Sequence, residues 1–144
     1  MSKILSFRGL LEDGGQDRIL LSTKKGEVGY RIVKFQVMPE KPGDVGQEAL
    51  VQIWSVEQST VATASGTVDF SNQTLLGALA GIFGVGEGLP TPIFFDNEIF
   101  NQDIYITHTD NKNAESINYH IELEQIKLSE HDAMVTTIQS IRNG

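Results

Sequence analysis

Apolar and polar residues alternate in short stretches along most of the chain, and turn residues separate the stretches. The first two stretches, Ile4–Leu11 and Arg18–Thr23, flank the turn signal Glu12-Asp13-Gly14-Gly15 and predict two strands with a tight connection. Alternate side chains lie on the same face of a strand, so this pattern indicates strands with one buried face. The chain is therefore expected to be mainly β.

Two central stretches predict the interior of the fold. Tyr30–Met38 alternates, and the residues expected on one of its faces are Val33, Phe35 and Val37. Ala49–Val56 is apolar on both faces, as in a strand at the middle of a packed sheet. The side chains expected in the core are Trp54, Phe35 and Ile121.

The second half of the chain predicts further strands. Ser55–Asp69 suits a strand or an exposed hairpin, and both Ile93–Phe95 and Ile99–Thr109 are expected to be strands. A polar turn at Asp110–Asn113 then leads to Ile117–Leu123, where apolar residues alternate with polar ones. This last stretch predicts a half-buried strand.

Between these strands lies Leu75–Val85, an apolar run interrupted by glycines. It is compatible with a short helix or a folded-in loop that closes one end of the fold. The alternative is a loop that inserts into a neighbouring subunit, because exposed apolar surface commonly marks a protein contact. The residues predicted for such an assembly interface are Leu75, Leu76, Leu79, Ile82 and Phe83. The run is too short for a helix that spans a bilayer, which needs about 20 residues.

Toward the end of the chain, the spacing of apolar residues changes from that of a strand to that of a helix. Met134, Ile138 and Ile141 repeat at helical spacing, and residues 130–142 therefore predict a short amphipathic C-terminal α-helix. No linker separates it from the strands, so residues 1–144 are expected to form one antiparallel β-sandwich domain with a jelly-roll-like arrangement. Periodicity alone fits another Greek-key sandwich equally well, because long-range contacts decide which strands pair.

Composition excludes several kinds of partner. The 144 residues carry a formal net charge of −8, and no basic cluster longer than Lys24-Lys25 occurs. Nucleic acid and anionic membranes are therefore not expected as partners, since both need a concentration of positive charge. The absence of cysteine removes disulfides and thiolate chemistry. The first residues lack the long apolar stretch of a signal peptide, so synthesis in a cytoplasm is expected.

No motif for a cofactor, a metal or a catalytic group is expected to be functional. The glycine-rich segment 77–88 lacks the Gly-Lys-Ser/Thr ending of a phosphate-binding loop. His108 and His120 are not spaced as local zinc ligands, although they would approach each other if their two strands paired. The best candidates for an enzyme are the carboxylates of Asp96, Glu98 and Asp103, which need a fixed separation in a cleft. The chain is not expected to be an enzyme.

Several phrases resemble a known group of proteins. They are the segment Phe95-Asp-Asn-Glu-Ile-Phe-Asn-Gln-Asp-Ile-Tyr-Ile-Thr107, the segment Asn118-Tyr-His-Ile-Glu-Leu-Glu-Gln-Ile-Lys-Leu128, and the ending Ile-Arg-Asn143. The openings Phe7-Arg-Gly-Leu-Leu and Asp17-Arg-Ile-Leu-Leu-Ser-Thr23 are similar too. Together they resemble small virion-associated structural proteins of marine bacteriophages. The resemblance implies a viral setting more strongly than any particular role within it.

Two functions follow as hypotheses. The first is a virion structural protein, a capsid component or a capsid-attached decoration or minor subunit, which binds copies of itself and other virion proteins and is located in the virion. The alternative is a carbohydrate- or receptor-binding module of a phage tail or spike. Exposed aromatic rings would then stack on sugars, and the candidates are Tyr30, Tyr105 and Tyr119.

Overall fold

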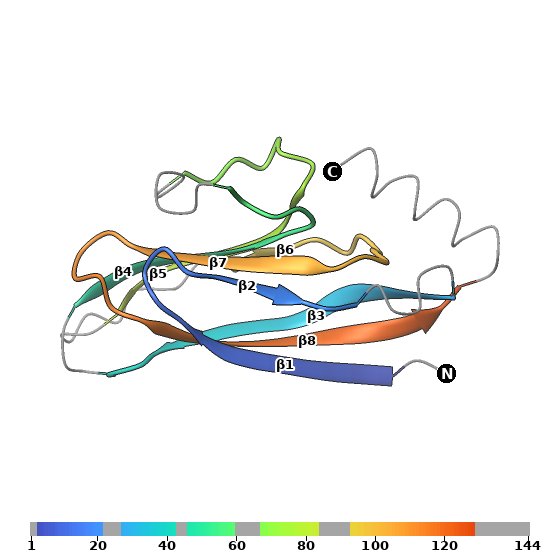
Figure 1. Ribbon diagram of the computed structural model, residues 1–144, viewed down its shortest axis with the longest axis horizontal. Helices are drawn as coiled ribbons and strands as arrows, with labels where there is room; N and C mark the ends of the chain where they lie inside the picture. Colours follow the sequence, from blue (N-terminus) through green and yellow to red (C-terminus); the bar gives the residue numbers. More distant parts are fainter. Residues whose placement is uncertain (1–2, 22–26, 43–45, 60–66, 84–92, 129–144) are drawn as a thin grey trace.

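The computed structural model describes residues 3–21, 27–42, 46–59, 67–83 and 93–128, and these form two antiparallel β-sheets (Figure 1). In chain order the strands are β1 (Lys3–Leu11), β2 (Gln16–Ile19), β3 (Val28–Pro39), β4 (Gln47–Trp54), β5 (Leu75–Phe83), β6 (Ile93–Phe95), β7 (Ile104–Asp110) and β8 (Ile117–Lys127). The described residues contain no helix, and the helix predicted at 130–142 lies outside them. The predicted mainly β, antiparallel fold is confirmed.

The strands form a sandwich of two sheets. One sheet has the order β1-β8-β3 and the other the order β2-β7-β4-β5-β6, and Figure 1 shows them as two layers. Fully buried side chains from both sheets meet between the layers, among them Ile32, Phe35, Ile121, Val51, Ile53 and Ile106. Each such side chain contributes about 1.5–3 kcal/mol by leaving water. The predicted core positions of Phe35 and Ile121 are confirmed.

Strand pairing is nested along the chain. β1 pairs with β8, β2 pairs with β7, and β4 pairs with β5. Within this series, Tyr30 of β3 forms an isolated bridge with Phe100, and their backbones exchange hydrogen bonds of 2.7 and 2.9 Å. Each element of the first half thus meets its counterpart in the second half. Pairing of β3 with β8 and of β4 with β7 then joins the nested pairs into two sheets.

β4 occupies the centre of the five-stranded sheet, as its two apolar faces predict. Trp54 lies on the face turned away from the core cluster, where it is buried and donates a hydrogen bond of 2.9 Å from Nε1 to Thr107 Oγ1. On the same face, Gln52 Nε2 donates a hydrogen bond to the backbone carbonyl of Thr67. The strand or hairpin predicted for Ser55–Asp69 is wrong for its described residues, which lie over the sheet without joining a strand.

The predicted faces of β3 are wrong in one half of the strand. The register with β8 shifts between Ile32 and Lys34, which marks a β-bulge. One extra residue reverses the alternation, so Ile32 and Phe35 both face the core while Val33 is 37% exposed. The bulge is a local irregularity that hydrophobic periodicity does not encode.

The prediction of a helix or loop at Leu75–Val85 is also wrong, because Leu75–Phe83 is strand β5. Both faces of its first five residues are buried, so this part of the run lacks the alternation of a half-exposed strand. Gly77 lets β6 come close: a Cβ at this position would lie 3.1 Å from the carbonyl oxygen of Phe94. Gly77, one of the glycines that suggested a loop, therefore serves close packing in a sheet.

Two other strands are shorter than predicted. β2 ends at Ile19, beyond which the amide of Leu21 donates to Oδ1 of Asp103 at 2.7 Å, and that bond turns the chain away from β7. β7 begins at Ile104 because Phe100, upstream, is paired with the other sheet. The turns predicted at Glu12–Gly15 and after Asp110 are confirmed.

Candidate assembly surfaces

The three-stranded sheet turns one face away from the core cluster. Its side chains, which we call the outer face, are Ile4, Ser6, Arg8 and Leu10 of β1, Asn118, His120, Glu122 and Glu124 of β8, and Arg31, Lys34, Gln36 and Met38 of β3. Large apolar groups are exposed at its margins, with Met38 62% exposed and Ile4 52% exposed. Apolar groups that remain exposed beside charged ones are typical of contact surfaces.

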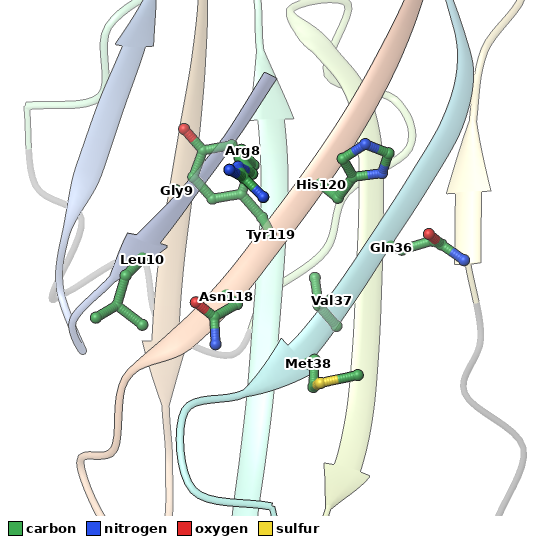
Figure 2. A pocket seen from close by; sticks show the side chains of 9 residues that line it. All are labelled: Arg8, Gly9, Leu10, Gln36, Val37, Met38, Asn118, Tyr119 and His120. Atoms are coloured by element: carbon green, nitrogen blue, oxygen red, sulfur yellow. The ribbon is translucent and has the colours of Figure 1, made fainter. Parts of the chain in front are cut away.

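A shallow hollow of about 730 Å³ lies on this face. Figure 2 shows His120 of β8 between Arg8 of β1 and Gln36 of β3, and the strand register places these three in one cross-strand row. The next row brings Leu10, Asn118 and Met38 together. The hollow thus combines hydrogen-bonding groups with two exposed apolar side chains, which suits a protein contact.

The charges of the outer face are ordered by strand. Glu122 and Glu124 lie on the central strand, and β3 supplies basic partners to both: Arg31 forms an ion pair with Glu124, and Lys34 stands opposite Glu122. Exposed ion pairs of this kind contribute little to stability, about 0–1 kcal/mol each. These ion pairs therefore add little to folding, and ordered charges of this kind are a feature that can orient a partner at an interface.

The edges of the two sheets differ in length and regularity. The five-stranded sheet ends in β2 and β6, which have only four and three residues. The three-stranded sheet ends in β1, with nine residues, and in β3, which carries the bulge and the bridge to Phe100. Short, bulged or covered edges resist pairing with another chain. Among the described strands, β1 alone has a long and regular free edge.

Most of the interface predicted from the sequence is buried inside the protomer. Leu75, Leu76 and Leu79 are 6%, 3% and 4% exposed. Phe83 packs against the core cluster, and only Ile82, 49% exposed, points outward. The apolar character of this run is explained by its place in the middle of the sheet. The sequence did not single out the outer face, because its polar residues alternate with apolar ones as they do on any solvent-exposed face of a strand.

The predicted aromatic platform is not assembled. Tyr30 and Tyr119 are 4% and 5% exposed and belong to the core cluster. Tyr105 alone is half-buried and lies with Arg18 and Asp103 around a hollow of about 380 Å³. The Arg18 guanidinium stands 6.0 Å from the centre of the Tyr105 ring, and its Nε donates to Asp103 Oδ2 at 2.7 Å. The hydrogen bond to Asp103 raises the pKa of Arg18 further.

The candidate catalytic carboxylates are not grouped. Asp96 follows β6 and Asp103 precedes β7, and the sheet order places two strands between β6 and β7. Three strand spacings amount to about 14 Å, more than the roughly 5–10 Å between the carboxylates of glycosidases. Asp103 is turned toward Arg18 on β2, away from β6. Glu98 lies between them in the chain and is half-buried.

The two candidate histidines do not approach each other through strand pairing, because β7 and β8 belong to different sheets. His108 is completely buried, and its Nδ1 lies 3.1 Å from the carbonyl oxygen of Leu11. Burial lowers the pKa of His108. Within the described part of the chain, no group of three or more metal-ligating side chains gathers, and no helix is long and apolar enough to cross a bilayer.

The likenesses of this chain to known proteins are structural and distant. No model of a protein family matches the chain, and no curated protein matches its sequence. A chain of turnip yellow mosaic virus has a TM-score of 0.39 and 11% identity over 90% of this chain and 95% of that one. A mitogen derived from Yersinia pseudotuberculosis has a TM-score of 0.35 and 10% identity over 92% and 94%.

A chain of mud crab tombus-like virus has a TM-score of 0.31 and 8% identity over 88% of this chain and 90% of that one. All three TM-scores lie below 0.5, so these likenesses establish neither a family nor a function. The functional reasoning therefore rests on the strand pairing and surfaces of this chain.

Proposed function

We propose that the chain is a virion structural protein, a capsid component or a capsid-attached subunit, that works by assembling with copies of itself and with other virion proteins. The nested strand pairing carries this proposal. A hairpin of paired segments wrapped into two sheets is the connectivity of a jelly roll, an architecture that viral capsid domains use. A jelly roll has one further pair of strands in this nested series. The bridge between Tyr30 and Phe100 lies at the corresponding position.

The surface supports a building block rather than a catalyst. The outer face offers exposed apolar side chains, ordered charges and a hollow of about 730 Å³, all on a rigid sheet. Such a surface favours a large protein contact over a small-molecule site, because a small-molecule site is usually a more enclosed, mostly apolar pocket.

The net charge of the chain supports a location in the particle that does not contact the viral genome. The chain carries −8, and a protein that lines nucleic acid needs clustered basic residues to neutralise phosphates. An acidic subunit fits the outer part of a particle, including the role of a decoration protein. The resemblance of several sequence phrases to virion-associated proteins of marine bacteriophages supports a phage particle as the location, with synthesis in the host cytoplasm.

Negative-stain electron microscopy and sedimentation velocity test the proposal. The purified chain is expected to form discrete oligomers or closed particles at high protein concentration. Met38→Asp, which places a charge on the outer face, should lower the average mass at the same concentration. Leu20→Asp is the matched control, because Leu20 is 66% exposed but lies outside the outer face. A chain that stays monomeric and binds no virion component contradicts the proposal.

A second function is favoured by one observation, the hollow beside Tyr105. A half-exposed aromatic ring next to an arginine and a buried carboxylate is a plausible sugar contact, and lectin domains also use the jelly roll. Binding to a glycan array that Tyr105→Ala removes would support a carbohydrate- or receptor-binding module. Binding that survives Tyr105→Ala, or no binding to any glycan, would discard this site.

A further inference from the structure

We propose that two copies of the chain join through the free edges of their β1 strands, in antiparallel register about a twofold axis at Phe7. The two three-stranded sheets would then form one continuous sheet with the order β3-β8-β1-β1-β8-β3. This interface deepens the proposed function, because it names the surface through which the first assembly step occurs. The proposal concerns only residues of β1 and their neighbours on β8.

The backbone of β1 is ready to pair. All nine residues from Lys3 to Leu11 are in uninterrupted register with β8, so the strand has no bulge. Every second residue of an edge strand directs its N–H and C=O groups away from the sheet. Over nine residues, about 30 Å of edge is therefore available. β1 contains no proline, the residue that most simply blocks such an edge.

The side chains of β1 favour one register. With the axis at Phe7, all nine residues of one β1 face a residue of the other, which no other centre achieves. Ile4 then stands opposite Leu10 of the second copy, and these side chains are 52% and 47% exposed in the protomer. Cross-strand apolar pairs stabilise a sheet, so the two most exposed aliphatic groups of β1 cover each other, once on each side of the axis.

Charge also favours this register. Ser6 stands opposite Arg8 of the second copy, and beyond the short Ser6 side chain lies Glu122 in the same cross-strand row. The basic side chain of one copy thus approaches an acidic side chain of the other. An axis at Arg8 would instead place two arginines directly opposite each other, and like charges in that position destabilise a sheet.

On the face of β1 that points toward the core cluster, the interface would cover side chains that are only partly buried in the protomer. Leu5 and Phe7 are only partly buried and pack against the edge of the core cluster. In the proposed dimer, Phe7 meets Phe7 of the second copy across the axis. Aromatic pairs stabilise an interface beyond the area that they bury.

Site-directed cross-linking tests the register. The natural chain has no cysteine, so Ile4→Cys and Leu10→Cys each carry a single thiol. A short bis-maleimide should join an equimolar mixture of the two variants into heterodimers, which mass spectrometry identifies. Either variant alone should cross-link at least tenfold less, because the like positions lie six residues apart along the paired strands, about 20 Å. Equal cross-linking in the single-variant samples would overturn the register.

Charge substitution tests the interface without a reagent. In Ile4→Lys/Leu10→Lys, lysines face each other twice, and the dimer dissociation constant should rise about tenfold or more. Ile4→Glu/Leu10→Lys should restore association, since each pair becomes attractive. Leu20→Lys/Val33→Lys, at exposed positions outside both β1 and the outer face, is the control expected to keep the dimer.

The outcomes separate this interface from the broader function. Oligomers that form without the Ile4–Leu10 cross-link, and that Ile4→Lys/Leu10→Lys does not disturb, would refute the β1 edge and leave self-assembly intact. A chain that is monomeric at every concentration would refute the β1 interface, and the broader function would be refuted with it only if that chain also bound no virion component.

Discussion

The hydroxyl of Tyr119 on β8 donates a hydrogen bond of 2.9 Å to Oδ2 of Asp17 on β2, and so links the two sheets. Tyr119 also lies over Gly9, its cross-strand neighbour on β1, where a Cβ would come within 2.8 Å of the tyrosine ring. Three strands thus meet at one side chain. The close approach requires glycine at position 9 and an aromatic hydroxyl at position 119.

Tyr119→Phe should lower the free energy of unfolding by about 1–2 kcal/mol, because it removes a hydrogen bond to a carboxylate in a largely buried place. Burial, with the hydrogen bond and charge of Asp17, raises the pKa of Tyr119 above its ordinary value. The unfolded chain therefore loses this proton first as the pH rises, and the native state loses stability above about pH 10.

Chemical denaturation at pH 8 and above pH 10 measures both effects. The alkaline loss should be smaller in Tyr119→Phe than in the natural chain. Tyr105→Phe, at a half-buried position, is the matched control and should keep the alkaline loss. An equal slope in the natural chain and Tyr119→Phe would contradict the role of this bond.

Gly9→Ala should destabilise the protein by about 1–3 kcal/mol, as overpacking of a filled site does. The new methyl group would meet the ring of Tyr119 and, at 2.9 Å, Oδ2 of Asp17. Gly46→Ala is the control, because the nearest atom there, at 3.0 Å, is Nζ at the end of the flexible Lys112 side chain. Thermal unfolding of both variants makes the comparison, and similar melting temperatures would count against the tight contact at Gly9.

The burial of His108 predicts that the folded protein loses stability in acid. Desolvation by burial lowers its pKa, while hydrogen bonds with the carbonyls of Glu12 and Leu11 act in the opposite direction. The unfolded chain therefore binds a proton at His108 near pH 6.5, whereas the folded chain binds it only at lower pH. The native state keeps its full stability above that pH and loses it as the pH falls below about 6.5.

His108→Asn removes this titration while its amide retains a donor for the carbonyl of Leu11. The slope of unfolding free energy between pH 7 and pH 5 should become flatter in this variant. His120→Asn, on the outer face, is the control and should leave the slope in place. A natural chain with no slope in this range would contradict the burial of a neutral His108.

Replacement of Asp103 should destabilise the protein more than replacement of Arg18, its ion-pair partner. Its side chain accepts hydrogen bonds from the amide of Leu21 and from Arg18, whose side chain is 57% exposed. Asp103→Ala leaves a buried amide without its acceptor and should cost about 1–3 kcal/mol. Arg18→Ala removes a largely exposed partner, whose ion pair is screened by solvent, and should cost less than Asp103→Ala. Urea unfolding of the two variants ranks them, and the reverse order would show that the ion pair dominates.

The sequence predicted strands best where only one face is buried. Ile117–Leu123 lies inside β8, and its apolar positions face the core as their alternation indicates. Prediction failed where both faces are covered, as in β5, because periodicity then disappears. It failed also at Ile32, where a bulge reverses the faces of β3.

The candidate surfaces were harder to predict for the same reason. Tyr30 and Tyr119 carry polar hydroxyls and suggested an exposed platform, yet both are buried. Whether β1 lies at an edge or in the middle depends on which strands pair, and that is a long-range property. The five predicted interface residues follow apolar composition, which reports burial in the protomer as readily as contact between protomers.

Self-assembly is the central claim, and static light scattering of the purified natural chain across a concentration series tests it most directly. The proposed interface predicts a mass that rises from that of one 15.8 kDa chain to at least twice that value as the concentration increases. The same series for Ile4→Lys/Leu10→Lys should stay close to one chain over the range where the natural chain associates. A natural chain that remains at 15.8 kDa throughout would contradict the account.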